Sequence, residues 1–325
     1  MKLLSRIFVL GLICIELISN ANGQSYKPEK YELTHGYLVV QSDSFIVIRD
    51  FYQKEKHFFV AVNSHRLDVK VILDSAVRFV PKAQDELMSM FKRTPYIKAI
   101  ENAELRSTML QNAGILRFPK INKGIDLTID LCPSKLPLDK DFFVKLINIL
   151  KVEEKPVPIA ISITGVWINE HPSDFAWLVG QEKVGNIKIT WVNHSYHHRV
   201  SKDLPLKENF LLEKGTNIND EILLTEKKLL VKGETPSPFF RFPGLVSDKA
   251  VFDSVISYGL IPIGSDAWLA KNQKPFAGSI VLVHANGNEP IGLKKFQKLL
   301  FEKRDSIVSK RWMLYDLRES VADEP

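Results

Sequence analysis

The strongest constraint on the fold is a regular alternation of short apolar runs with amphipathic segments over residues 116–325. The apolar runs have the length of buried strands and are expected at 125–131, 157–164, 186–192, 239–242, 260–263, 279–283 and 311–315. The segments with helical spacing are expected at 140–150, 172–183, 219–231, 248–258 and 292–303. Strands and helices in succession indicate parallel strands with crossover helices. Seven such strands predict an α/β fold, an incomplete (β/α)7 barrel, with an open doubly wound sheet as the alternative.

Residues 24–115 have a different pattern and are predicted to form a small N-terminal α+β accessory domain. Runs rich in Val, Ile and Phe predict strands at 37–41, 45–49, 57–62 and 69–73. A long helical stretch is expected from Ala83 to Ala113, broken near Pro95 because proline interrupts a helix. The barrel is expected to begin at residue 116, and the sequence indicates no function for the region before it.

Residues 1–23 are typical of a secretory signal peptide, with a basic start, an apolar run and small residues before the expected cleavage site. The apolar run is too short to span a bilayer and contains Glu16, which argues against an uncleaved anchor. We therefore expect a secreted or periplasmic protein of the cell envelope, with no stable membrane anchor after cleavage. Cys14 would leave with the peptide, so Cys132 would have no partner for an intrachain disulfide.

Composition and charge restrict the class of partner. The chain has 45% hydrophobic and 25% charged residues, which is typical of a globular protein. Its net charge of +6 comes from 44 basic and 38 acidic residues. The basic residues are scattered and form no stripe with interleaved aromatic residues, so we expect no nucleic-acid partner. A weakly anionic partner, such as a cell-wall glycan, agrees with this charge.

Titratable residues stand at the predicted carboxyl ends of the strands, where parallel β/α folds carry their active sites. Five of the seven strand ends carry residue types of a hydrolytic centre, which are Asp130, His194 with His198, Arg241, Asp266 and His284. If a helix starts at His194, then His198 lies on the same face, and both imidazoles could bind one zinc ion. Arg241 has apolar neighbours and is expected to pair with Asp130 and lower its pKa. The simpler alternatives are a capping aspartate, histidines that only form hydrogen bonds, and a histidine buried in the core.

Five short motifs, in this order, resemble those of the polysaccharide deacetylases, the NodB-homology family also known as carbohydrate esterase family 4. The resemblance extends from near Gly124 to the C-terminus and leaves the N-terminal region unexplained. The motifs in this sequence are Thr128–Ser134, Asn193–His198, Arg241–Gly244, Asp266–Trp268 and Leu282–His284.

This resemblance implies a metal-dependent hydrolase that removes N- or O-linked acetyl groups from a glycan or cell-wall polysaccharide, with a divalent metal, zinc, as cofactor. The implied roles are a general base at Asp130, metal ligands at His194 and His198, a general acid at His284, a charge partner of the base at Arg241, a partner of the acid at Asp266, and substrate contacts at Trp268 and Pro243.

One position departs from the family pattern. The second aspartate of the first motif, a metal ligand in the family, is replaced by Leu131, which cannot bind a metal. Either another ligand completes the site or the metal is lost, and the candidates for the ligand are Cys132, His197 and Asp130 itself. A thiolate with two histidines is a good donor set for zinc.

Three functions therefore stay open. The first is a deacetylase with an altered metal site, and the second is a glycan-binding or assembly module that has lost catalysis. The third is a cysteine hydrolase in which Cys132 is the nucleophile. A glycoside hydrolase has less support because no paired catalytic carboxylates stand out.

Overall fold

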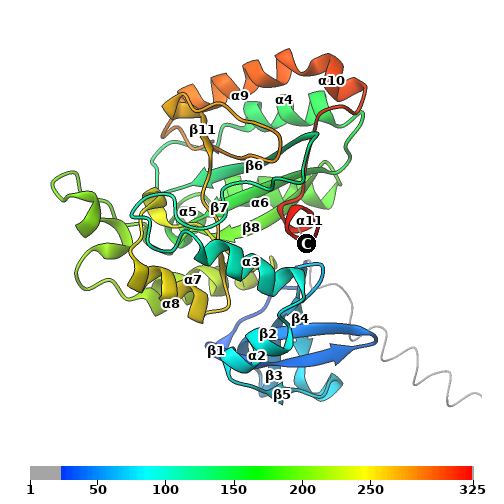
Figure 1. Cartoon of the computed structure of the whole chain (residues 1–325), viewed down its shortest axis with the longest axis vertical. Helices are drawn as coiled ribbons and strands as arrows, with labels where there is room; N and C mark the ends of the chain where they lie inside the picture. The colour runs from blue at the N-terminus through cyan, green and yellow to red at the C-terminus, as the bar shows by residue number, and fades with distance from the viewer. Residues whose placement is uncertain (1–22, 324–325) are drawn as a thin grey trace, which may run out of the picture.

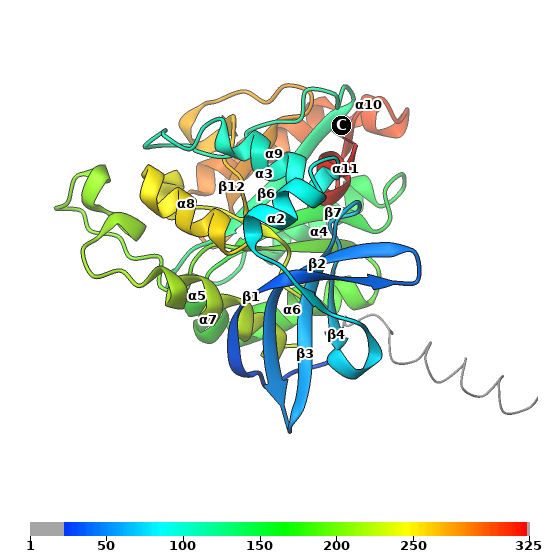
Figure 2. The same cartoon turned by 60° about the horizontal axis from the view of Figure 1, so that its bottom comes forward.

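The protein is described by a computed structural model covering residues 23–323, in which an antiparallel sheet lies beside a larger parallel β/α barrel (Figure 1). Figure 2 shows the same two parts from a second direction. The predicted signal peptide lies outside the described residues, apart from Gly23. Within the described part, no helix is both long and apolar enough to cross a membrane.

The N-terminal sheet has five antiparallel strands in the order β4-β3-β2-β1-β5. Its strands are β1 (Glu29–Val40), β2 (Asp43–Gln53), β3 (Lys56–Asn63), β4 (Val69–Leu73) and β5 (Val80–Pro81). The four predicted strands are confirmed. The first two are much longer than their apolar runs because pairing continues through polar residues, and β5 was not predicted.

The predicted long helix is two short helices, α2 (Gln84–Met90) and α3 (Pro95–Glu104). Pro95 is the first helical residue of α3, a position where the missing amide proton costs no hydrogen bond, so the predicted break is confirmed. The extension of the helix to Ala113 is wrong. The chain here bonds to a barrel loop instead, since the amide of Asn112 donates to the carbonyl of Leu245 at 2.7 Å.

The barrel sheet has the order β10-β9-β8-β7-β6-β12-β11, with β13 paired to β6, and every pairing is parallel. Its strands are β6 (Gly124–Leu131), β7 (Val157–Ile163), β8 (Ile187–Asn193), β9 (Phe239–Phe240), β10 (Ile261–Pro262), β11 (Ala267–Trp268), β12 (Ile280–His284) and β13 (Met313–Leu314). Strands β6 to β10 follow one another around the ring in sequence order, β12 and β11 continue it on the other side of β6, and the ring is open between β10 and β11. The predicted incomplete barrel is therefore confirmed over the doubly wound alternative, and β11 is an additional strand.

Helices cover the outside of this barrel (Figure 1). They are α4 (Lys140–Leu150), α5 (Gly165–Glu170), α6 (Pro172–Lys183), α7 (Ile218–Val231), α8 (Lys249–Ser257), α9 (Pro290–Glu302) and α10 (Arg304–Val308). In α4 the side chain of Asp139 caps the helix by accepting from the amide of Phe142, and the apolar face is buried. All five predicted barrel helices are confirmed within two residues at each end.

The side chains of β6 alternate between the two sides of the barrel wall. Leu127 and Ile129 pack in the core beneath the helices, whereas Asp126, Thr128 and Asp130 make polar contacts inside the barrel. At the amino end of β6, Ser320 of the C-terminal helix α11 (Leu317–Ala322) donates to Asp126 at 2.7 Å. The helix therefore packs at this end, which leaves the opposite end of β6 for the candidate site.

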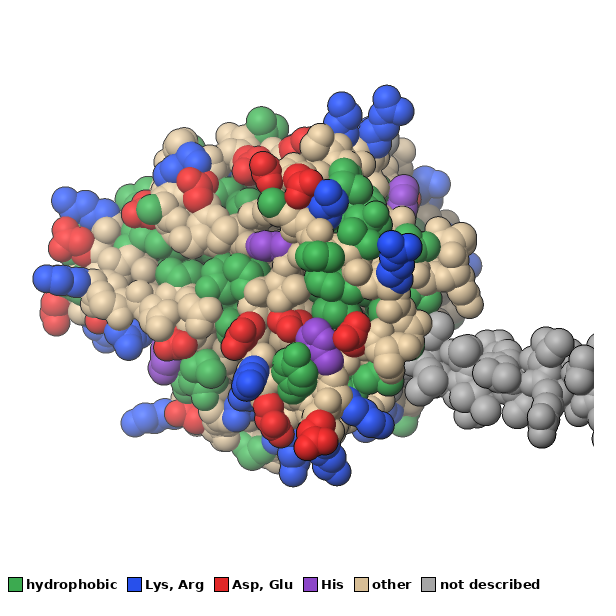
Figure 3. Space-filling model, turned by 90° about the horizontal axis from the view of Figure 1, so that it is seen from below, with side chains coloured by type: hydrophobic (Ala, Val, Ile, Leu, Met, Phe, Trp, Pro, Cys, Tyr) green, Lys and Arg blue, Asp and Glu red, His purple; other side chains and the backbone are tan. Residues whose placement is uncertain are grey.

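The N-terminal sheet is joined to the barrel by a buried ion pair. Nε and Nη2 of Arg49 donate to the two carboxylate oxygens of Glu226 on α7, at 2.8 and 2.9 Å. One continuous apolar core also contains residues of both parts, such as Phe51 and Phe252. On the face seen in Figure 3, which looks onto the N-terminal sheet, acidic and basic side chains are interspersed.

Candidate metal and catalytic site

The predicted strand-end residues meet at one cavity of about 660 Å³ at the carboxyl end of the barrel. Its lining includes Asp130, Cys132, His194, His198, Trp268 and His284. They come from β6, β11 and β12 and from the loops that follow β6 and β8. Residues that are far apart in the sequence therefore share one cavity because the parallel strands end at the same rim.

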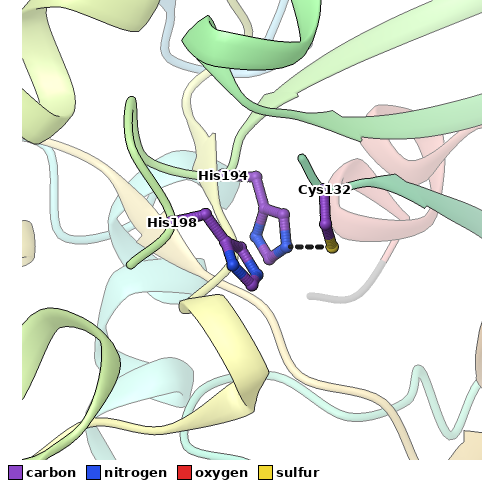
Figure 4. Close-up of side chains that lie close together, drawn as sticks. All are labelled: Cys132, His194 and His198. Atoms are coloured by element: carbon purple, nitrogen blue, oxygen red, sulfur yellow. Dashed lines mark hydrogen bonds between the residues drawn. The ribbon is translucent and has the colours of Figure 1, made fainter. Parts of the chain in front are cut away.

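Cys132, His194 and His198 form a compact group of donor atoms (Figure 4). One ligand atom of each residue lies within 4.8 Å of those of the other two. Sγ of Cys132 is 3.5 Å from Nε2 of His194, and the rings of His194 and His198 are 4.8 Å apart at their centroids. Since a thiolate and two imidazoles are a common donor set for zinc, these residues could hold a metal ion.

A second contact supports this donor set. Nδ1 of His194 lies 2.8 Å from the carbonyl oxygen of Arg241, which can only accept a hydrogen bond. The proton of the neutral ring is therefore on Nδ1, and Nε2 has a free lone pair on the side of Cys132. Metal-binding histidines are typically oriented in this way by a backbone carbonyl, so the residues present fit a zinc ion.

The two histidines converge through a loop and not through the helix start considered from their spacing. Residues 194–200 form no helix, and both Ser195 and His198 have positive φ angles, 67° and 50°. The loop is held by side chains, since Ser195 donates its amide to Asn193 and accepts from the amide of His198. A tight loop therefore brings His198 back beside His194.

His197 points away from this group. Its Nδ1 lies 2.8 Å from Oε1 of Glu221 on α7, and its own amide also donates to Glu221. Of the three candidates for the missing ligand, the structure therefore brings Cys132 to the histidine pair, whereas His197 bonds to Glu221 on α7. Leu131 packs into the core between the sheet and the helices, so its side chain lies in the apolar layer outside the barrel.

Asp130 and Arg241 form a buried ion pair, as their sequence environment predicts. Nη1 of Arg241 donates to Oδ1 of Asp130 at 2.9 Å and to the hydroxyl of Thr128 at 2.7 Å. Burial alone would raise the pKa of Asp130, but Arg241, then His194 and His284, lower it below its usual value. The other oxygen, Oδ2, lies 3.7 Å from Nε2 of His194 and is directed toward the donor group.

The thiol and the strand-end imidazole also have shifted pKa values. Burial raises the pKa of Cys132, but His198, His194 and His284 outweigh it and hold the pKa well below the usual value. Burial lowers the pKa of His284, but Cys132, Glu289 and Asp130 together raise it to about 10. The cavity therefore favours a thiolate, a carboxylate and a protonated imidazole near neutral pH.

The remaining predicted residues lie in different places. Trp268 lines the cavity. Pro243 is buried, and its neighbours Gly244 and Leu245 reach the cavity instead. Asp266 lies 4.0 Å from Arg117, so its carboxylate is not the partner of His284 that the resemblance implies.

Glu289 is a residue of the site that the sequence interpretation missed. Its Oε2 lies 2.9 Å from Nδ1 of His284 and accepts from Nε1 of Trp268 at 2.6 Å. The available signal was an acidic residue five positions after a strand-end histidine, directly before Pro290. Asp266 differs because it precedes the short strand β11 and turns toward the segment before the barrel.

Fold and site together define a β/α-barrel protein with a candidate three-ligand metal site beside Asp130 and His284. No protein-family model matches the chain. Among solved structures, the chain is similar to a family 4 carbohydrate esterase pseudoenzyme from Bacillus anthracis, with 18% identity, coverage of 66% of this chain and 70% of that one, and a TM-score of 0.44.

Two further structures are similar to this chain. For a family 4 carbohydrate esterase from Bacillus anthracis the identity is 18%, the coverage 68% of this chain and 90% of that one, and the TM-score 0.44. For a family 4 carbohydrate esterase from Streptomyces lividans in complex with acetate, the identity is 20%, the coverage 60% of this chain and 92% of that one, and the TM-score 0.39. All three are named as members of the family that the five motifs resemble.

Proposed function

We propose that this protein is a metal-dependent hydrolase that removes N- or O-linked acetyl groups from a glycan in the cell envelope. The observation that carries the proposal is the meeting of three chemical functions in one cavity. They are the donor group of Cys132, His194 and His198, the carboxylate of Asp130, and the imidazole of His284. A binding module needs no such combination of base, acid and metal ligands.

In this proposal Cys132, His194 and His198 hold a divalent metal, and their sulfur and nitrogen donors favour zinc. Zinc, when bound, supplies Lewis acidity that polarises a carbonyl group and makes water more acidic. Because Cys132 takes the place of the missing aspartate as ligand, Asp130 is left free to act as the base.

Asp130 takes a proton from the attacking water through Oδ2. Its other oxygen is occupied by Nη1 of Arg241 at 2.9 Å, so the ion pair fixes the plane of the carboxylate. The same contact, with the neighbouring histidines, lowers the pKa of Asp130 and keeps it ionised and ready to accept the proton.

His284 donates a proton to the leaving group when the bond between the acetyl carbon and the sugar nitrogen or oxygen breaks. Burial lowers the pKa of His284, but Glu289 and Asp130 raise it and favour a ring that carries this proton at neutral pH. The products are acetate, which keeps the oxygen of water, and an amine or alcohol on the sugar. Water supplies both the oxygen and the protons, so the reaction is a hydrolysis.

The glycan is the substrate class implied by the five motifs, and the presence of an aromatic side chain in the cavity agrees with it. Trp268 offers part of its ring at the mouth, where an aromatic wall can pack against a sugar ring. Export to the cell envelope is part of the proposal and rests on the signal-peptide pattern of residues 1–23.

The direct test is acetate release by the zinc-loaded protein from an N-acetylated chitooligosaccharide and from an O-acetylated xylan. The proposal predicts release from at least one of them, lost in Asp130→Asn. Asparagine keeps the size of the side chain but cannot act as the base. Equal release by both proteins would contradict the mechanism, and glycan binding without any release would favour the binding module.

A second candidate, the cysteine hydrolase, is favoured by the contact between Cys132 and His194 at 3.5 Å. Cys132→Ser separates the two. If the cysteine is the nucleophile, turnover is lost while the metal content stays the same. If it is a ligand, the metal and the turnover are lost together.

A further inference from the structure

The loop after β12 carries a carboxylate that joins two residues of the cavity. Glu289 immediately precedes α9, and its side chain is mostly buried. One oxygen, Oε2, serves both partners, since it accepts from Nε1 of Trp268 at 2.6 Å and lies 2.9 Å from Nδ1 of His284. The approach to His284 is out of line with the N–H bond, so this contact is an ion pair and not a linear hydrogen bond.

A second contact holds the indole of Trp268, on the face of its ring. Nζ of Lys271 lies 3.6 Å from the centre of the Trp268 ring, the arrangement of a cation–π contact. The centroids of the Trp268 and His284 rings are 6.2 Å apart. Trp268 is thus held in one place, and its N–H group fixes the position of the Glu289 carboxylate.

The aspartate that the motif resemblance gives for this task is engaged elsewhere. Oδ2 of Asp266 lies 4.0 Å from Nε of Arg117, and its Oδ1 is buried without a hydrogen-bond partner. Among the described residues, the carboxylate that contacts Nδ1 of His284 is that of Glu289.

We propose that Glu289 is the positioning residue of His284, and that Trp268 in turn positions Glu289. The inference rests on the proposed function for its effect on turnover, but the contact itself does not depend on it. Holding the ring through Nδ1 leaves Nε2 as the nitrogen that can donate a proton into the cavity. The acid of this chain is therefore oriented by a residue from the loop after its own strand and not by Asp266 of the fourth motif.

The test compares Glu289→Gln and Glu289→Ala with Asp266→Asn as the matched control, all as full-length zinc-loaded proteins. The first readout does not need activity. Nitrogen-15 NMR of histidine-labelled protein at one fixed pH shows whether Nδ1 and Nε2 of His284 each carry a proton, and His284→Gln identifies its signals. We expect the Nδ1 proton in wild type and in Asp266→Asn, and its loss or exchange broadening in Glu289→Ala.

The second readout is acetate release. We expect kcat to fall roughly 10- to 100-fold in Glu289→Ala, with KM within about twofold, because proton donation acts on the chemical step. Glu289→Gln keeps an acceptor for Trp268 and should recover part of this loss. If Glu289 had a purely structural role, the fall in kcat would accompany a fall in thermal stability, and Glu289→Gln would not recover kcat.

The outcomes are separable. If Glu289→Ala leaves the His284 signals unchanged while Asp266→Asn alters them, the inference is overturned whatever the activity. If wild type releases no acetate but Glu289→Ala still displaces the Nδ1 proton, the proposed function fails and the positioning role of Glu289 stands.

Discussion

Arg241 and Asp130 form an ion pair that is buried on both sides, with side-chain exposures of 0% and 4%. The pair lies between β6 and the loop after β9, and Arg241 also donates to Gly264 at 2.8 Å. A charge removed from water in this way is stable only while its partner is present. The pair therefore contributes to folding as well as to the proposed chemistry.

Arg241→Met should lower the free energy of unfolding by about 3–5 kcal/mol, because it leaves Asp130 buried without a counter-charge. Lys249→Met is the control, since Lys249 forms an exposed pair with Asp253, and its loss should cost less than about 1 kcal/mol. Urea unfolding followed by circular dichroism measures both. Equal losses in the two variants would contradict a buried pair.

Asp130→Asn and His284→Ala should each abolish acetate release while the bound zinc is kept, and Asp130→Asn should also lower the thermal midpoint because Arg241 loses its counter-charge. Neither residue belongs to the donor group, so metal content is expected to stay at the wild-type level in both variants. The checks are acetate release, metal analysis and the thermal midpoint Tm. Full activity in either variant would show that the proton transfers have been assigned to the wrong residues.

The two adjacent histidines should behave differently toward zinc. His198→Ala removes a donor and should weaken zinc binding, roughly 10-fold or more. His197→Ala should leave zinc affinity unchanged, because His197 is paired with Glu221 at 2.8 Å. A competition titration with a chromophoric chelator measures both constants, and weaker binding in His197→Ala would place the ligand set one residue away from the one described.

The sequence was sufficient to predict the barrel, because each strand is a separate apolar run and each helix has its own apolar face. The contact of Arg241 with Asp130 was predictable for a similar reason. A charged residue in an apolar segment needs a partner, and the strand ends of a parallel barrel supply few choices.

The details of the site depend on loops, and these could not be predicted from local patterns. Ser195 and His198 take positive φ angles that nothing in their residue types requires, and the loop is held in part by Glu221 of the distant helix α7. The role of Glu289 likewise depends on the position of Trp268, which is far from it in the sequence. Spacing therefore predicted that His194 and His198 meet, but for the wrong local structure.

The buried carboxyl of Glu154 should make stability depend on pH. It accepts from the amide of Leu314 at 3.1 Å, and burial raises its pKa to about 7. Because the folded-state pKa is above the unfolded value, the stabilisation is fully present below about pH 4.5 and is lost as the pH rises through about 7.

Glu154→Gln should therefore show a flatter pH dependence than wild type between pH 4.5 and 7, with a difference of at most about 3 kcal/mol. The exposed residue Glu302 gives the control variant Glu302→Gln, which should follow wild type. Urea unfolding across this pH range measures the difference. Parallel curves for wild type and Glu154→Gln would mean that this carboxyl titrates at its usual pKa.

The central claim is that Cys132 replaces the missing aspartate as the third protein ligand beside His194 and His198. Its most direct test is the electronic absorption spectrum of the cobalt(II)-substituted protein, in wild type and in Cys132→Ser. A thiolate ligand gives an intense sulfur-to-cobalt charge-transfer band in the near ultraviolet, which serine cannot give. We predict this band in wild type and its loss in Cys132→Ser, while Asp130→Asn keeps it. A cobalt-loaded wild type without the band, or with the same band after Cys132→Ser, would contradict the account.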